Sequence, residues 1–314
     1  MQKPMDGDQM TRSRLKKRIL VLPGGGATGI ATMRVLEALE EKLNRPIAHL
    51  FDEIWASSVG SLMAAYLTES TLQGGLATPV RTAKQVSNLI RESFSNPWNA
   101  WGCLARLKRE VDPQVTLRDT VIPLKILAAE VRDYSEKVGY SFGDFLTETI
   151  GLGSDTHSYL SLIEAVSASC AVHPIFPVQR IRAATPGEDV IHCIDAGCGV
   201  CTQPTLDPTQ HFLAELSRNG FKFENGIQIF FISNGWARLL DKIPAEIEVF
   251  NFDLDLSPWF KKIGSGQLQQ RIVANCFGAG FASPSILDTL ARDSIFGDNW
   301  GLFQRMLDEL TDRE

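Results

Sequence analysis

Residues 18–29 of this chain read Arg-Ile-Leu-Val-Leu-Pro-Gly-Gly-Gly-Ala-Thr-Gly, and residues 51–60 read Phe-Asp-Glu-Ile-Trp-Ala-Ser-Ser-Val-Gly. In each stretch a short apolar run typical of a β-strand stops at a tight turn, and apolar residues at helical spacing follow. We expect the two helices over 30–43 and 61–67. The order strand, turn, helix, strand, turn, helix predicts a right-handed parallel βαβ unit and an α/β fold.

The composition is that of a globular chain with enough apolar residues for a sizeable core. Its 314 residues are 44% hydrophobic and 22% charged, which fits one α/β domain with inserted loops. The formal net charge of −6 argues against nucleic acid as the main partner, because phosphate binding needs a surplus of Lys and Arg. No uninterrupted apolar stretch is long enough to span a bilayer, and no apolar signal-peptide core stands near the N-terminus. We therefore expect a cytoplasmic protein with no transmembrane segment.

The chain divides into a short tail and one domain. Residues 1–17 are polar and run into the basic segment 12–18, so we expect a solvated, disordered tail, with contact to anionic lipid as the alternative for the basic segment. Residues 18–314 contain no internal repeat, no low-complexity tract and no linker. We expect a single domain there, with a core over 18–235 and a C-terminal strand and helices over 236–314.

Further elements follow from the same patterns. We expect strands over 121–131, 190–194, 227–233 and 246–256, with 137–142 as a hairpin partner of the first. We expect helices over 81–94, 104–110, 161–169 and much of 267–314, and a loop over 71–79. Trp98 and Trp101 lie in a loop between the first two of these helices, where they either cap the core or form a lid at a lipid interface.

A serine in the second turn has the surroundings of a nucleophile. Ser58 has Ala56 two positions before it and Gly60 two positions after it. A strand-to-helix elbow that exposes a serine hydroxyl is sterically tight and needs small residues at these two positions. Ser57 has larger neighbours at the same offsets and fits worse. The expected elbow consists of Ala56, Ser57, Ser58, Val59 and Gly60.

The glycine-rich first turn offers backbone N–H groups to an anion. Such groups can hold the oxyanion of a tetrahedral intermediate, each contributing roughly 3 kcal/mol. Dinucleotide binding is the competing interpretation, because Gly24, Gly26 and Gly29 have the spacing of that fingerprint. That fingerprint also requires an acidic residue at the end of the second strand, whereas Asp52 and Glu53 stand at its start. We therefore favour acyl transfer, with an oxyanion hole formed by Gly24, Gly25, Gly26, Ala27, Thr28 and Gly29.

A nucleophilic serine needs a base, and two arrangements are open. Ser58, Asp195 and His211 occur in the chain order of an α/β-hydrolase triad. Alternatively, Asp195 accepts the Ser58 proton directly in a Ser–Asp dyad. Asp195 lies at the end of a predicted buried strand, whereas His211 follows Asp207-Pro208 in what we expect to be an exposed helix start.

The cysteines do not predict a disulfide scaffold. There are 6 of them in a chain of this size, which is unlike a small secreted protein. His192, Cys193, Cys198 and Cys201 form a local cluster, but their spacing has no second paired half of a zinc motif. We favour buried thiols over a metal site.

Four ordered blocks of the sequence resemble the patatin-like phospholipases. These blocks are residues 24–29, 56–60, 168–177 and 195–197. The stretch 115–142 also resembles the central strand and hairpin of that family, so the resemblance covers roughly residues 18–235. It implies a three-layer α/β/α sandwich with a mainly parallel central sheet and a Ser–Asp dyad of Ser58 and Asp195. It also implies phospholipase A-type hydrolysis of glycerolipid esters at a membrane or micelle surface, with peripheral membrane contact and without a metal or other cofactor.

The chain departs from the family pattern at three positions. Thr28 stands where the family often has Arg or Lys, Ala56 where it has Gly, and Ala196 where it has Gly after the aspartate. These departures leave the nucleophile and base in place. They raise the alternative of a catalytically weak or inactive relative that binds lipid or a partner protein, and an NAD(P)-binding protein is a third interpretation.

Overall fold

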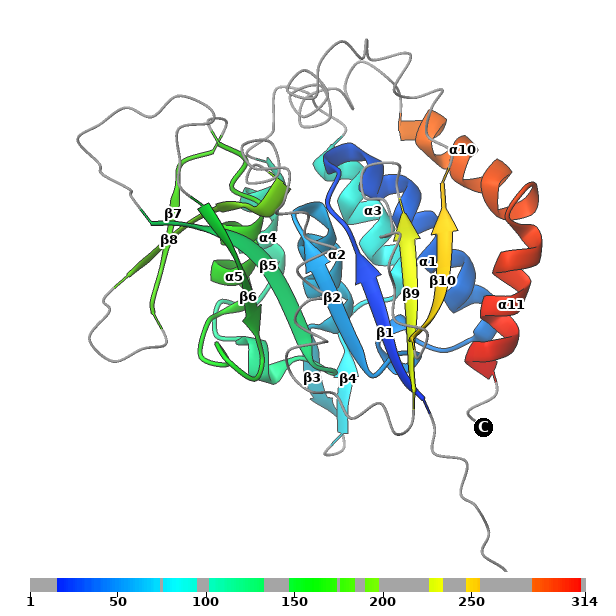
Figure 1. Cartoon of the computed structure of the whole chain (residues 1–314), viewed down its shortest axis with the longest axis horizontal. Helices are drawn as coiled ribbons and strands as arrows, with labels where there is room; N and C mark the ends of the chain where they lie inside the picture. Colours follow the sequence, from blue (N-terminus) through cyan, green and yellow to red (C-terminus); the bar gives the residue numbers. More distant parts are fainter. Residues whose placement is uncertain are drawn as a thin grey trace, which may run out of the picture.

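The computed structural model describes residues 16–73, 76–94, 102–132, 147–173, 176–183, 190–197, 226–233, 247–254 and 284–311. Its centre is an eight-stranded sheet (Figure 1). The strands are β1 (Lys17–Leu22), β2 (Glu53–Ser57), β5 (Leu124–Val131), β6 (Thr147–Gly153), β7 (Gln179–Ile181), β8 (Ile191–Asp195), β9 (Ile227–Ser233) and β10 (Ile247–Asp253). They follow the order β10-β9-β1-β2-β5-β8-β7, and β6 also pairs with β5.

The sheet has a parallel part and an antiparallel part. The parallel part consists of β10, β9, β1, β2 and β5, in which each strand runs parallel to the next. Strands β6 and β8 both run antiparallel to β5, and β7 runs antiparallel to β8. The predicted βαβ unit is confirmed, because β1 and β2 are adjacent and parallel and a helix joins them.

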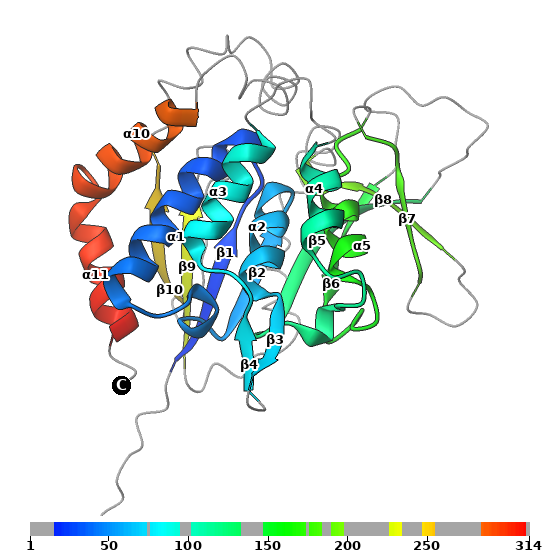
Figure 2. The same ribbon diagram turned by 180° about the vertical axis from the view of Figure 1, so that it is seen from behind.

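Most helices of the described residues lie on one face of the sheet. They are α1 (Gly29–Leu43), α2 (Val59–Thr68), α3 (Ala83–Ser93), α4 (Gly102–Glu110), α5 (Leu162–Ser169), α10 (Pro284–Phe296) and α11 (Trp300–Thr311). Figure 2 shows α1, α2, α3 and α5 in front of the strands, whereas they lie behind the sheet in Figure 1. Helices α10 and α11 pack on α1, and α11 also reaches β10 at the edge of the sheet.

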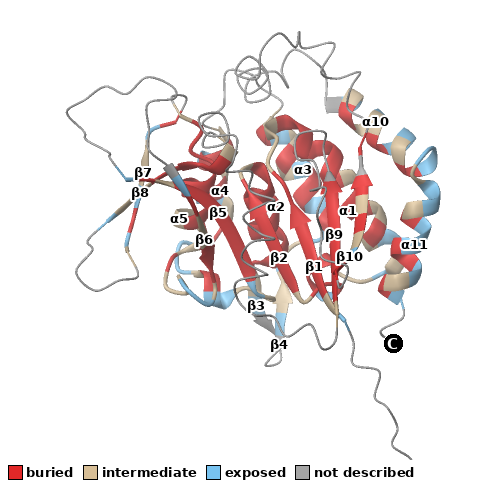
Figure 3. Ribbon diagram, viewed as in Figure 1, coloured by how far each residue is buried: buried red, intermediate tan, exposed pale blue. Residues whose placement is uncertain are grey.

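Both faces of the central strands are buried (Figure 3). Leu20 and Leu22 of β1 belong to the large cluster that includes the helices, while Ile19 and Val21 belong to a second cluster. Alternate residues of a strand point to opposite faces, so the second cluster lies on the other side of the sheet. The expected three-layer α/β fold with a mainly parallel central sheet is confirmed.

Two stretches differ from the sequence-based expectation. The loop expected over 71–79 was wrong, because β3 (Ser70–Gln73) and β4 (Leu76–Pro79) pair there as an antiparallel hairpin. Two short runs separated by Gly74-Gly75 are a hairpin signal that the loop interpretation overlooked. Within the described part, β5 has β6 as its antiparallel partner on one edge, and no expectation covered β6.

Several expectations fall on residues that the structure does not describe. They are residues 1–15 of the expected tail, Trp98, Trp101, the hairpin strand 137–142, Cys198, Cys201 and His211. The tail expected to reach residue 17 ends earlier, because Lys17 is the first residue of β1. Among the helices that are described, none has the length together with the apolar composition that crossing a bilayer requires.

Candidate active site

The serine and the aspartate meet along one edge of β5. At Leu127, β5 pairs with Ser57, the last residue of β2. At the next position, Ala128, it pairs with Asp195, the last residue of β8. Strand β6 pairs with both positions from the opposite edge, so β2 and β8 share the remaining edge. Ser58 and Asp195 therefore lie side by side where β2 leaves the sheet and β8 takes its place.

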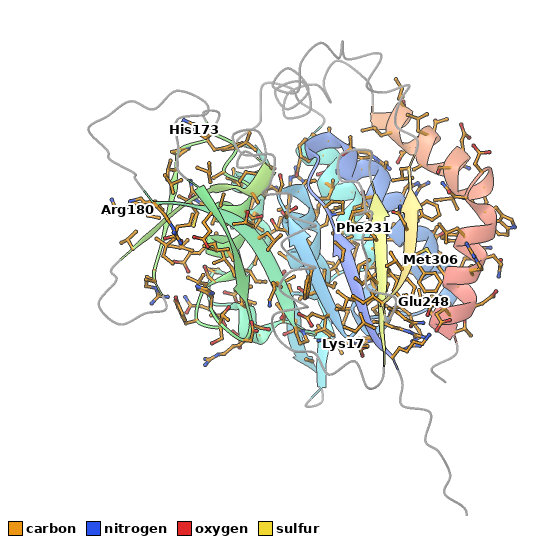
Figure 4. The ribbon with its side chains drawn as sticks, viewed as in Figure 1. Lys17, His173, Arg180, Phe231, Glu248 and Met306 are labelled. Atoms are coloured by element: carbon orange, nitrogen blue, oxygen red, sulfur yellow. The ribbon has the colours of Figure 1, made fainter. Side chains whose placement is uncertain are left out.

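This meeting point lies at the carboxyl end of the parallel strands, where open α/β sheets bind their ligands. Figure 4 shows His173, which follows the end of α5, at this end of the molecule, and Lys17 at the opposite end of β1. Ser58 is partly exposed, whereas Ser57 and Asp195 are both buried. A substrate can thus reach the Ser58 hydroxyl while the carboxylate stays shielded from solvent.

The backbone of Ser58 is strained. Its φ is 50° and its ψ is −129°, outside the left-handed helical region. The other non-glycine residue with positive φ in the described part is Asn44, which has an ordinary left-handed conformation at the end of α1. Strained non-glycine residues cluster at functional sites, and a serine on a sharp strand-to-helix turn presents its hydroxyl away from the sheet.

Three glycines let the two turns pack directly against each other. A Cβ on Gly60 would lie 2.0 Å from the carbonyl oxygen of Leu22, so the first turn of α2 approaches the end of β1 too closely for any side chain. A Cβ on Gly24 would lie 2.8 Å from the Cβ of Ser58. A Cβ on Gly29 would lie 2.9 Å from Cγ2 of Val59. The glycine loop is thus the wall of the site next to Ser58.

The loop presents backbone donors that have no acceptor within the part of the chain that the structure describes. Gly25 and Gly26 have φ values of 146° and 57°, and a short 3₁₀ helix over Gly26–Thr28 leads into α1. Among the described residues, no acceptor meets the N–H groups of Gly25, Gly26 and Ala27. The other predicted loop donors are engaged within the protein: the N–H of Gly24 with the Ser57 hydroxyl, that of Thr28 with the carbonyl of Gly25, and that of Gly29 with the carbonyls of Gly26 and Ala27.

Asp195 has the environment of a base that works near neutral pH. Burial raises the pKa of Asp195 to about 6, and hydrogen bonding from the Ser58 hydroxyl and the Gly197 N–H opposes this rise. The Gly197 N–H donates to Oδ1 at 2.7 Å. Oδ2 is buried and has no hydrogen-bond partner within the described part of the chain. Catalytic hydrogen bonds are often long before substrate binds.

Thr28, Ala56 and Ala196, the three departures from the family pattern, have side chains that are buried in the protein. Thr28 is fully buried, and its hydroxyl donates to the carbonyl of Gly25 at 2.8 Å. Ala56 lies in β2 within the large core cluster. Ala196 lies in the second cluster and is fully buried. Their methyl groups fill core space, and Thr28 supports the turn of the glycine loop.

The acidic residues that a dinucleotide site would need lie elsewhere. Asp52 accepts the backbone N–H of Arg18 at 2.7 Å, and Glu53 pairs with Lys17 and with the indole N–H of Trp55. These contacts are at the amino end of β2, the opposite end of the strand from the glycine loop. In the described part of the chain, no three His, Cys, Asp or Glu side chains are grouped closely enough to hold a metal.

Ser169 and Cys170 are site residues to which the sequence analysis gave no role. The Ser169 hydroxyl accepts the backbone N–H of Ser58 at 2.8 Å, and the Cys170 thiol donates to the carbonyl of Ser58 at 3.1 Å. The resemblance over 168–177 was the signal in the sequence, but nothing in it indicated contacts to Ser58. The alternative base, His211, lies outside the described residues, so the triad stays a prediction.

Comparison with known proteins gives a family match and two curated relatives. The family described as patatin-like phospholipase matches residues 20–201. The chain is 28% identical over 196 residues to the cUMP-AMP-activated phospholipase of Escherichia coli, covering 60% of this chain and 57% of that protein. It is 36% identical over 67 residues to phospholipase A I of Arabidopsis thaliana, covering 21% of this chain and 5% of that protein. The chain thus spans little more than half the length of the first relative and a small part of the second.

Two solved structures are similar at low sequence identity. The type III effector protein ExoU matches with a TM-score of 0.41 and 13% identity, over 93% of this chain and 53% of that one. VipD from Legionella pneumophila matches with a TM-score of 0.35 and 12% identity, over 87% of this chain and 67% of that one.

Proposed function

This chain belongs to the patatin-like phospholipase family, and we propose that it is a serine lipid acyl hydrolase of the phospholipase A type. One observation carries the proposal: the strained Ser58 directly follows Ser57, which pairs with Leu127 of β5, and the buried Asp195 pairs with the next β5 residue from the same edge. The N–H groups of Gly25, Gly26 and Ala27 next to Ser58, for which the described residues offer no acceptor, support the same assignment.

In the proposed reaction, the Ser58 hydroxyl attacks the carbonyl carbon of a fatty acyl ester. Asp195 accepts the hydroxyl proton as the new C–O bond forms. The N–H groups of Gly25, Gly26 and Ala27 stabilise the oxyanion of the tetrahedral intermediate, at about 3 kcal/mol for each well-placed donor. When the intermediate collapses, the ester C–O bond breaks, and Asp195 returns the proton to the leaving alcohol. Ser58 is then left as an acyl ester.

In the second half of the reaction, water hydrolyses the acyl–Ser58 ester, and Asp195 again acts as the base. Asp195 takes a proton from a water molecule, which attacks the acyl–Ser58 ester through a second oxyanion. The Ser58 oxygen leaves, regains the proton and releases the fatty acid. A carboxyl with a pKa of about 6 supports this assignment, because it is largely ionised at neutral pH yet basic enough to accept a proton.

The proposed substrate is the acyl ester of a glycerolipid. Both curated relatives are named phospholipases, which supports a phospholipid as the substrate class. Such a substrate resides in a membrane or micelle, so we propose a cytoplasmic enzyme that contacts a lipid surface peripherally and needs no cofactor.

Fluorophosphonate labelling together with lipid hydrolysis tests the proposal. We expect wild type to be labelled and to release fatty acid from phospholipid vesicles, and Ser58→Ala to do neither. Ser167→Ala is a matched control, because its hydroxyl is buried on α5 without a hydrogen-bond partner among the described residues. Full activity of Ser58→Ala would overturn the proposal. Absence of labelling in wild type with every vesicle composition would favour the inactive, lipid-binding or protein-binding relative.

The base has its own test. In the dyad, Asp195→Asn loses activity and His211→Ala keeps it. If Asp195→Asn kept full activity while His211→Ala lost it, the triad would replace the dyad.

A further inference from the structure

The Ser169 hydroxyl fills a gap that β2 leaves in the sheet. β2 ends at Ser57, which pairs with Leu127, so the next N–H, that of Ser58, has no strand to bind. Ser169 Oγ accepts this N–H at 2.8 Å and donates to the carbonyl of Leu127 at 2.6 Å. The Ser169 side chain is fully buried at the end of α5. One hydroxyl thus ties the start of the Ser58 turn to β5.

The next residue holds the other side of the Ser58 backbone. The thiol of Cys170 donates to the carbonyl oxygen of Ser58 at 3.1 Å, and the hydroxyl of Ser61 donates to the same oxygen at 2.6 Å. Ser58 is therefore held at its N–H and at its carbonyl group, on either side of its strained φ and ψ angles. Strained conformations persist when surrounding contacts over-determine them.

The third residue of this segment holds the aspartate. The carbonyl oxygen of Ala171 accepts the backbone N–H of Asp195 at 3.0 Å. Three consecutive residues, 169–171, thereby contact the main chain of both Ser58 and Asp195. Ser58 follows β2 and Asp195 ends β8, and these two strands have no direct pairing with each other.

We infer that residues 169–171 are a positioning segment, which holds the main chains of Ser58 and Asp195 next to each other and so sets the approach of the hydroxyl to the carboxylate during proton transfer. This inference rests on the proposed function. The contacts that the segment makes to Ser58 and Asp195 are to their main chains, so it acts through these two main chains. A displacement of about 1 Å in a reacting group can cost on the order of 100-fold in rate, so a hydroxyl behind the nucleophile is expected to affect turnover strongly.

Removal of the Ser169 hydroxyl is the first test, with a soluble short-chain ester as substrate. We expect Ser169→Ala to lower kcat by about 100-fold while KM changes by no more than about threefold, because substrate contacts remain. The rate constant of fluorophosphonate labelling should fall in parallel. Ser167→Ala, on the same helix, should behave as wild type, since it removes a buried hydroxyl that makes no hydrogen bond within the described residues.

The thiol offers a second pair of variants with less effect on packing. Cys170→Ser keeps a donor for the Ser58 carbonyl and should retain activity near that of wild type. Cys170→Ala leaves the hydroxyl and the N–H of Ser61 and the N–H of Leu62 as donors to the Ser58 carbonyl, so we expect a fall in kcat of only about three- to tenfold with KM unchanged. Rescue by the conservative variant distinguishes the hydrogen bond from a general loss of packing.

Failure of this inference can be separated from failure of the proposed function. If Ser58→Ala is as active as wild type, the proposed function fails. If Ser58→Ala is inactive but Ser169→Ala keeps kcat within about threefold of Ser167→Ala, the positioning role fails and the nucleophile stands. A rise in KM with unchanged kcat would also overturn the positioning role. If Ser169→Ala does not fold, the Cys170 pair decides: equal kcat for Cys170→Ala and Cys170→Ser rejects the inference.

Discussion

The hydroxyl oxygen of Ser57 accepts a hydrogen bond from the backbone N–H of Gly24 at 3.0 Å, which joins the serine turn to the glycine loop. Ser57 is buried and precedes the proposed nucleophile, and its hydroxyl supports the glycine loop. The two turns of the βαβ unit thus form one structure.

Loss of this contact should weaken the site without abolishing it. We expect Ser57→Ala to slow fluorophosphonate labelling by about tenfold, because one neutral hydrogen bond that aligns the oxyanion donors is removed. Ser58→Ala, measured alongside, should show no labelling. If Ser57→Ala were not labelled while Ser58→Ala was labelled, Ser57 and not Ser58 would be the nucleophile.

Activity should depend on the ionisation of Asp195. Its pKa is raised to about 6 by burial, and the proposed base must be deprotonated to accept the Ser58 proton. We expect kcat/KM for an uncharged soluble ester to rise about tenfold per pH unit below pH 6 and to level off above it. The residual kcat/KM of Asp195→Asn should not show this rise with pH. A flat wild-type profile between about pH 4.5 and 8 would contradict the assignment.

The Asp195 carboxyl should lower the unfolding free energy when it is charged. The folded state binds its proton more tightly than the unfolded chain does, because the pKa rises from 3.8 to about 6. The stability that the protonated carboxyl contributes is complete below about pH 4 and is lost as the pH rises through about 6. Relative to wild type, Asp195→Asn should therefore gain up to about 3 kcal/mol in unfolding free energy between pH 4 and pH 8. Denaturant unfolding of both proteins at both pH values measures this gain. If the variant and wild type differ in unfolding free energy by the same amount at both pH values, the prediction is wrong.

Gly60 should tolerate no side chain. Gly60→Ala places a Cβ against the backbone carbonyl of Leu22, at a distance of 2.0 Å before any movement. We expect a loss of about 3 kcal/mol or more in unfolding free energy, since backbone atoms on both sides must shift. Gly301→Ala on α11 is the matched control, because nothing lies within 4 Å of the added Cβ. Ala favours a helix over Gly by up to about 1 kcal/mol, so this control should be neutral or stabilising.

Local patterns in the sequence were enough for most of the fold. Strand β9 was predicted with the bounds it has, and the strand-turn-helix order at the two turns gave the βαβ unit. Apolar periodicity and turn glycines act over a few residues, so they can be read without a structure. The hairpin of β3 and β4 was missed although Gly74-Gly75 marks it, because its strands have only 4 residues each. Strand β6 was missed because Ile150 and Leu152 are its only large apolar residues, which is too few for a clear alternation.

By itself, the sequence determined which residue types meet the needs of acyl transfer: a serine between small residues, a glycine loop and an aspartate at a strand end. These are local requirements of a tight turn, and Gly60 and Gly24 meet them because a Cβ at either position would collide with its neighbour. Only the tertiary structure decided that β2 and β8 share one edge of β5, and that residues 169–171 bind the main chains of Ser58 and Asp195. Strand order and contacts between distant segments depend on packing of the whole sheet, which no local pattern encodes.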